Sequence, residues 1–148
     1  MTAATRAIPH QELTYRIIGC AMEVHNRLGP GLREKAYQRA LSHAMEGAGL
    51  SFEAEKPFEV AFDGTRIGRL IIDHLVEDSI VVEEKALSHL LTNDEVAQVV
   101  TYLAATGAPI GLLLNFGRPR LQYRRILPPR KLDLWQDRVR RFIGATSR

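Results

Sequence analysis

The sequence lacks the features that define secreted, membrane-spanning and repetitive proteins. Cys20 is its one cysteine in 148 residues, so no disulfide can form within the chain, and a reducing compartment, the cytoplasm, is expected. The longest aliphatic stretches are far shorter than the roughly 20 residues that cross a bilayer. The N-terminus has no basic segment followed by an apolar run, and no repeat or low-complexity segment is present. We therefore predict a soluble globular protein without a membrane partner.

Two common kinds of ligand site are also missing from the sequence. Gly29-Pro30-Gly31 is too short for a phosphate-binding loop and is not followed by Lys-Ser or Lys-Thr. The five histidines show no ligand spacing such as His-x-x-x-His. What remains is an ordinary globular composition, 45% hydrophobic and 25% charged, at a length that suits one domain over residues 1–148.

Positive charge is concentrated at the C-terminal end of the chain. Residues 1–117 hold 10 Lys and Arg against 15 Asp and Glu, whereas residues 118–148 hold 10 against 2. An acidic body with this basic C-terminal flank suits a polyanionic partner such as DNA or RNA, although a solvated basic helix would give the same pattern. The candidate nucleic-acid contacts are Arg118, Arg120, Arg124, Arg125 and Arg130.

The apolar pattern predicts two helices, three or four strands, a further helix, two strands and a last helix. Helical spacing is found in residues 11–28 and 32–47, after the capping box Thr92-Asn93-Asp94-Glu95, and at Leu132, Trp135, Val139 and Phe142. Strands are expected at 51–56, 58–62, 66–76, 79–86, 110–116 and 121–127, with a turn at Asp63-Gly64. This order predicts an α/β or α+β sandwich around a mixed sheet.

Three charged residues on two of these strands could form a catalytic site. Side chains alternate along a strand, so Glu83 and Lys85 project from one face while Glu84 projects from the other. A hairpin between the strands would bring Asp73 near Glu83, and two carboxylates with a main-chain carbonyl suit Mg²⁺ or Mn²⁺. Lys85 could then orient an attacking water in phosphodiester hydrolysis. The alternative is an exposed hairpin with a cross-strand ion pair.

Two pairs on predicted helices could add to this site. Gln98 and Tyr102 are four residues apart and share a helix face, where an amide and a phenol can contact a phosphate or a metal-bound water. Glu34 comes early in the second helix, three residues before Tyr37. Each pair also has a structural interpretation, because tyrosines often lie at the edge of a core and the helix dipole favours an early glutamate.

Taken together, these residues resemble a known family. Gly31-Leu32-Arg33-Glu34-Lys35-Ala36-Tyr37 matches the signature of the GxxExxY proteins, and the similarity covers roughly residues 11–127. That family looks like a branch of the PD-(D/E)XK nuclease superfamily, and the resemblance implies a restriction-endonuclease-like α/β core with a central mixed sheet flanked by helices. The resemblance implies that Asp73 and Glu83 bind the metal and that Lys85, Glu34, Gln98 and Tyr102 are catalytic. Glu84 departs from the family pattern, because an apolar residue is usual there.

The sequence thus predicts a metal-dependent nuclease that uses Mg²⁺ or Mn²⁺ to hydrolyse phosphodiester bonds in DNA or RNA. A nucleic-acid- or protein-binding module that keeps the fold without the chemistry is the main alternative. A structural protein in which Glu34, Glu83 and Lys85 form an internal ion network is a third. DNA or RNA, endo or exo cleavage, and a monomer or a homodimer all stay open.

Overall fold

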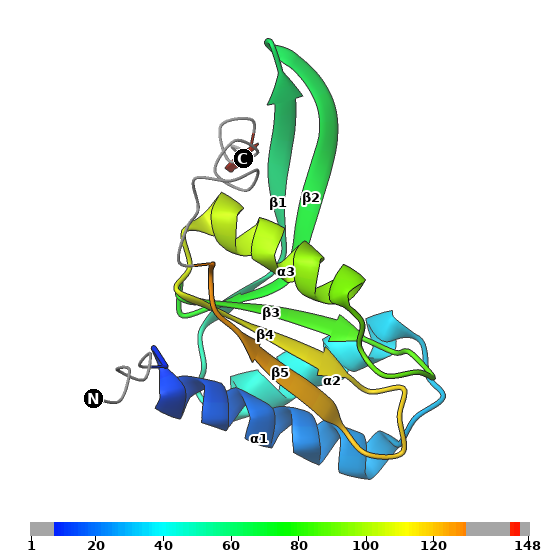
Figure 1. Cartoon of the computed structure of the whole chain (residues 1–148). Coiled ribbons are helices and arrows are strands. Elements are labelled where there is room, and N and C mark those ends of the chain that lie inside the picture. The colour runs from blue at the N-terminus through cyan, green and yellow to red at the C-terminus, as the bar shows by residue number, and fades with distance from the viewer. Residues whose placement is uncertain (1–7, 130–142, 146–148) are drawn as a thin grey trace, which may run out of the picture.

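A mixed sheet forms the centre of the structure, a computed structural model that describes residues 8–129 and 143–145. The strands follow the order β5-β4-β3-β2-β1-β6, in which β3 and β4 are parallel and the other neighbours antiparallel (Figure 1). The helices are α1 (Gln11–Leu28), α2 (Glu34–Gly47) and α3 (Asn93–Thr106). The strands are β1 (Phe52–Phe62), β2 (Thr65–Val76), β3 (Ile80–Lys85), β4 (Ile110–Asn115), β5 (Gln122–Ile126) and β6 (Ile143–Ala145). The predicted α/β class with a mixed sheet is confirmed.

Helices cover both faces of the central strands. In β3, Ile80 and Val82 belong to the core formed with α1 and α2, whereas Val81 belongs to the core formed with α3. Because β3 and β4 are buried on both faces, their apolar residues run almost without interruption. We refer below to the α2 face and the α3 face of the sheet.

Local sequence signals place the helices where they were predicted. Thr92 forms the capping box of α3: its hydroxyl accepts a hydrogen bond from the Asp94 N–H at 3.3 Å, and its own N–H donates to Glu95 Oε1 at 2.9 Å. Gly107 ends the helix with φ 73°, a left-handed conformation that glycine adopts without strain. No helix in the described part of the chain is long and apolar enough to cross a membrane.

The β1–β2 hairpin differs from the prediction in length. Residues 52–62 form one strand that continues through Pro57, instead of two strands separated there. Pro57 is tolerated because β6 pairs only with residues 58–60 of β1, which leaves an edge where a missing N–H breaks no ladder bond. The hairpin turns at Asp63-Gly64, as predicted, and its tip extends beyond the helices (Figure 1).

The C-terminal region agrees only in part with the prediction. The residues that marked a last helix, Leu132, Trp135, Val139 and Phe142, lie outside the described residues. Residues 143–145 form β6, which pairs with residues 58–60 of β1. No strand was predicted there, because three residues give too short a pattern to recognise.

Candidate active site

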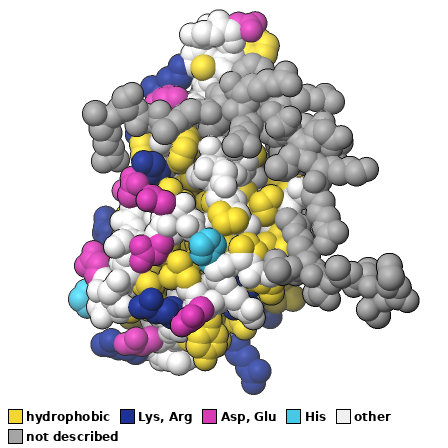
Figure 2. Space-filling view, turned by 90° about the vertical axis from the view of Figure 1, so that its left-hand side faces the viewer, with side chains coloured by type: hydrophobic (Ala, Val, Ile, Leu, Met, Phe, Trp, Pro, Cys, Tyr) yellow, Lys and Arg dark blue, Asp and Glu magenta, His cyan; other side chains and the backbone are white. Residues whose placement is uncertain are grey.

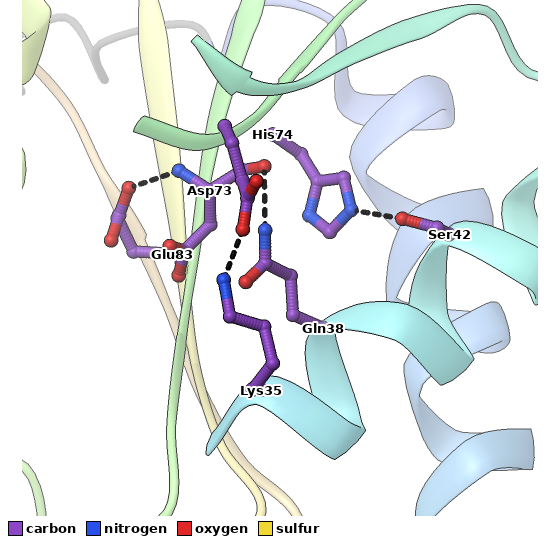
Figure 3. A network of polar contacts seen from close by, with 7 residues as sticks. Lys35, Gln38, Ser42, Asp73, His74 and Glu83 are labelled. Atoms are coloured by element: carbon purple, nitrogen blue, oxygen red, sulfur yellow. Dashed lines mark hydrogen bonds and ion pairs between the residues drawn. The ribbon is translucent and has the colours of Figure 1, made fainter. Parts of the chain in front are cut away.

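Asp73 and Glu83 lie side by side on neighbouring strands. The antiparallel pairing of His74 with Val82 puts Asp73 opposite Glu83, and Glu83 projects toward the α3 face with Val81. The Asp73 N–H donates to Glu83 Oε1 at 2.9 Å (Figure 3). The Glu84 N–H donates to Asp73 Oδ2 at 2.9 Å. These side-chain bonds continue the contact between β2 and β3 beyond the last regular pair, so the two carboxyl groups are held in place by the backbone.

Burial gives this pair its electrostatic character. Glu83 is 2% exposed, and burial raises its pKa well above the usual range of a glutamate. The negative charge of Asp73 raises the pKa of Glu83 further, while Lys85 lowers it. Two adjacent carboxyl groups with little water around them favour either a shared proton or a cation between them.

Lys85 and Glu34 border the same pair. Lys85 is two residues after Glu83 on β3 and so shares its face. Glu34 is the first residue of α2; burial raises its pKa, the nearby Lys85 lowers it and the nearby Asp73 raises it. These mutual effects locate Glu34, Asp73 and Lys85 in one neighbourhood.

Tyr37, the last residue of the signature, is structural. It is fully buried and stacks on Phe116 with ring centroids 4.8 Å apart. Its hydroxyl donates to the Gly29 carbonyl at 2.5 Å and accepts from the Leu32 N–H at 3.1 Å. Tyr37 therefore fixes the loop before α2, and this loop sets the position of Glu34 beside the carboxylates.

Tyr102 and Gln98 reach the site from α3. Tyr102 is buried, and burial raises the pKa of its hydroxyl, with the charges of Glu83 and Asp73 raising it further. Gln98 Nε2 donates to the Tyr102 hydroxyl at 3.1 Å. The phenol consequently stays protonated and keeps a hydrogen to donate toward the carboxylate side.

The end of β3 is held by residues that lie within the stretch resembling the family but received no role in the sequence analysis. The Phe116 N–H donates to the Lys85 carbonyl at 2.8 Å. The buried Asn115 side chain accepts from the Leu87 N–H at 2.9 Å and from the Gly117 N–H at 3.1 Å. These bonds tie the segments after β3 and β4 together and fix the backbone that carries Lys85. An asparagine at the end of a buried strand is the signal that could have indicated them.

A second polar chain on the α2 face was not predicted. His74 Nδ1 lies 2.6 Å from Glu84 Oε1. His74 Nε2 lies 2.7 Å from the Ser42 hydroxyl of α2 (Figure 3). His74 and Glu84 are both fully buried; burial lowers the pKa of His74 to about 4 and raises that of Glu84 well above its usual range. These opposite shifts of pKa favour a neutral pair in which Glu84 carries the proton. Glu84 departs from the apolar pattern because His74, its diagonal neighbour across the strands, gives it a partner.

The predicted nucleic-acid contacts do not share one face. Arg124 and Arg125 are consecutive in β5 and project to opposite faces, and Arg125 donates to the Thr14 hydroxyl of α1 at 3.1 Å. Arg118 donates to the Ser88 carbonyl at 2.9 Å, and Arg120 is exposed in the loop after β4. Arg130 lies outside the described residues. Basic and acidic side chains are interspersed on the side of the molecule seen in Figure 2.

The donor atoms at Asp73 and Glu83 fit a small, hard divalent cation. Mg²⁺ in proteins is commonly bound by one or two carboxylates and retains several waters. Within residues 8–129, no group of three or more His, Cys, Asp and Glu side chains gathers as a metal cage. Two carboxylates without a histidine or cysteine ligand therefore suit Mg²⁺ or Mn²⁺ better than zinc.

The fold and this acidic pair with its lysine define an α/β protein of the nuclease type. The model of the PD-(D/E)XK nuclease superfamily matches residues 11–126, and the chain belongs to this superfamily. The GxxExxY branch within it stays a prediction. No curated protein matches the chain.

Solved structures agree on the fold. The crystal structure of SSO0001 is similar, with a TM-score of 0.54 and 22% sequence identity over 66% of this chain. The match covers 50% of the SSO0001 chain, so the protein spans about half the length of that relative. At this identity the likeness concerns the fold alone.

Proposed function

We propose that the protein is a metal-dependent nuclease that hydrolyses phosphodiester bonds in DNA or RNA. The observation that carries the proposal is the pair Asp73 and Glu83, in which the Asp73 N–H donates to Glu83 at 2.9 Å and the Glu84 N–H donates to Asp73 at 2.9 Å. Lys85 lies on the same face of β3 as Glu83. Membership of the nuclease superfamily supports the reaction class. A domain over residues 1–148 and a cytoplasmic location are part of the proposal, the latter supported by the single, buried cysteine.

The side chains have separate roles in this proposal. Asp73 and Glu83 hold Mg²⁺ or Mn²⁺, which when bound stabilises charge on the phosphate and lowers the pKa of a water. Lys85 orients the attacking water and neutralises charge that develops on the phosphate oxygens. The protonated Tyr102 hydroxyl, fixed by Gln98, donates to a phosphate oxygen. Glu34 accepts a hydrogen bond from water at the edge of the site.

The arginines of the basic C-terminal flank bind the substrate backbone in this proposal. Arg120 and Arg124 are exposed, whereas Arg118 and Arg125 already donate to other groups within the described part of the chain. Phosphate contacts of this kind position a nucleic acid without reading its sequence. Arg130 stays a candidate from the sequence alone.

A cleavage assay tests the proposal. Labelled single-stranded DNA, duplex DNA and RNA are incubated with the full chain in Mg²⁺, in Mn²⁺ and in chelator. We expect cleavage only with metal, and a loss of about a hundredfold or more in Asp73→Asn and in Lys85→Ala. Asp78→Asn, the same change at an exposed turn residue, is the matched control and keeps full activity. Binding without cleavage of any substrate would identify a binding module instead.

A further inference from the structure

A cleft of about 530 Å³ opens directly beside Asp73. It lies between the first turns of α2 and the inner part of the β1–β2 hairpin, and its walls include Lys35, Gln38, Glu55, Arg69, Ile71 and Asp73. The volume falls in the range of small-molecule pockets, roughly 300–1,000 Å³. The cleft can therefore receive a group about the size of one nucleotide, but not a stacked duplex.

The backbone explains why the sheet is open at this point. β1 and β2 pair at Ala54 with His74 and again at Lys56 with Ile72, but Glu55 and Asp73 between them form no pair. Glu55 has φ 54°, a left-handed conformation that is rare for a residue with a side chain. The Glu55 side chain reaches α2, where it meets Lys35.

The cleft presents a row of different chemical groups that leads to Asp73. Arg69, Ile71 and Asp73 are alternate residues of β2 and so project from one side of the strand, spread over about 13 Å. Ile71 is 47% exposed and offers an apolar surface between the guanidinium and the carboxylate. Lys35 and Gln38 face the same space from α2 (Figure 3).

Two cations of the cleft are available to an anion. Arg69 is exposed and has no ion-pair partner within the residues that the structure describes. Lys35 pairs with Glu55, but both side chains are about half exposed, 51% and 52%. An exposed pair of this kind contributes about 0–1 kcal/mol, so a phosphate can displace Glu55 from Lys35 at little cost.

We propose that this cleft binds the nucleotide next to the phosphodiester that is cut, taken from a single-stranded segment. Arg69 and Lys35 contact its phosphate, and its sugar and base lie against Ile71. The inference rests on the proposed function, because Asp73 joins the cleft to the candidate metal site. A paired nucleotide would first have to leave its stack, at a cost of a few kcal/mol. The protein consequently prefers single strands or unpaired ends, and DNA and RNA share the required phosphate.

Binding measurements without metal test the cleft separately from the reaction. Fluorescence anisotropy is measured in chelator with the full chain and labelled oligonucleotides of about 12 nucleotides. The probes are single-stranded DNA, single-stranded RNA and a blunt DNA duplex. The variants are Arg69→Ala and Lys35→Ala. Arg66→Ala is the matched control, since Arg66 is an exposed arginine of the same strand that pairs with Glu59 outside the cleft.

We expect Arg69→Ala to weaken single-strand binding about tenfold and to reduce the slope of log affinity against log salt by about 0.7. Lys35→Ala should weaken single-strand binding less than Arg69→Ala does. In the parent, Lys35 must give up its pair with Glu55 to contact the phosphate, so its net contribution is smaller. Arg66→Ala should change the affinity for single strands less than twofold. Arg69→Ala and Lys35→Ala should change the affinity for the duplex less than twofold. Comparing DNA with RNA shows which nucleic acid supplies the nucleotide.

The outcomes separate this inference from the proposed function. The cleft proposal is overturned if Arg69→Ala binds single strands as tightly as the parent. It is also overturned if Arg66→Ala loses as much affinity, or if Arg69→Ala loses as much affinity for the duplex. Each of these results counts even if the parent cleaves with metal. A selective loss in Arg69→Ala by a protein that never cleaves supports the cleft and rejects hydrolysis. A parent that neither binds nor cleaves any probe overturns both.

Discussion

At the scale of single residues, Glu84 and His74 show how this chain accommodates polar groups directly behind its candidate site. Both are fully buried and touch at 2.6 Å, on the face opposite Glu83. Removing one partner of a buried pair typically costs about 3–5 kcal/mol, whereas replacing both by apolar residues is often neutral or stabilising.

We therefore predict opposite results for single and double substitutions of this pair. His74→Phe alone leaves Glu84 buried without its partner and should lower the free energy of unfolding by about 3 kcal/mol. His74→Phe combined with Glu84→Leu should restore it to within about 1 kcal/mol of the parent. Urea denaturation of the parent, both singles and the double variant measures the coupling, and additive losses would contradict the pair.

The pH dependence of the free energy of unfolding of the same variants tests whether the buried His74–Glu84 pair holds one proton. Burial lowers the pKa of His74 to about 4 from 6.5, so its contribution to stability is complete above pH 6.5 and falls as the pH drops toward 4. Burial raises the pKa of Glu84 above 4.5, so its contribution is complete below pH 4.5 and falls as the pH rises.

These two effects cancel between pH 4.5 and 6.5, because the folded and unfolded pairs then each hold one proton. Above pH 6.5 the difference in free energy of unfolding between the parent and the double variant should decrease by about 1.4 kcal/mol per pH unit, until Glu84 ionises. A difference that stays constant above pH 6.5 would show that the buried pair keeps no proton.

At the scale of elements, the segments after β3 and β4 determine the position of Lys85. A Cβ atom on Gly117 would lie 2.4 Å from the Leu87 carbonyl oxygen, a contact with backbone that cannot move aside cheaply. We predict that Gly117→Ala lowers the free energy of unfolding by about 1–3 kcal/mol. Gly68→Ala is the control, because its Cβ meets nothing within 4 Å and its φ is not positive. Equal stability of the two variants would contradict this account.

The elements that the sequence predicted correctly are those with local causes. The α1 stripe, the capping box at Thr92 and the turn at Asp63-Gly64 depend on neighbours in the chain. The predicted hairpin also forms, and it brings Asp73 next to Glu83, two residues before Lys85 on β3. The roles assigned to these residues stay proposals.

The features that were missed depend on contacts between distant segments. The link from Ser42 to His74 exists only once α2 packs on the sheet. The cleft forms where Glu55 and Asp73 are unpaired. The strand β6 forms only because residues 143–145 pair with residues 58–60 of β1, which are distant in the sequence. The positions of Arg118 and Arg125, which bond to Ser88 and Thr14, likewise follow from packing that charge patterns do not reveal.

At the scale of the whole molecule, the candidate site joins both layers of helices to the sheet. Glu34 comes from α2, Asp73, Glu83 and Lys85 come from the sheet, and Tyr102 comes from α3. A cation bound there would contact all three layers in the folded protein and would not bind the unfolded chain. Metal binding should therefore appear as an increase in global stability.

Thermal melts of the parent and of Asp73→Asn, each in chelator and in Mn²⁺, test the central claim most directly. In chelator the variant should be at least as stable as the parent, because a repulsion between carboxylates is relieved. Mn²⁺ at about 100 times its Kd should stabilise the parent by about 2.7 kcal/mol and the variant much less. Equal melting temperatures for the parent with and without Mn²⁺, beside a large loss of stability in the variant, would show an internal ion network and contradict the metal site.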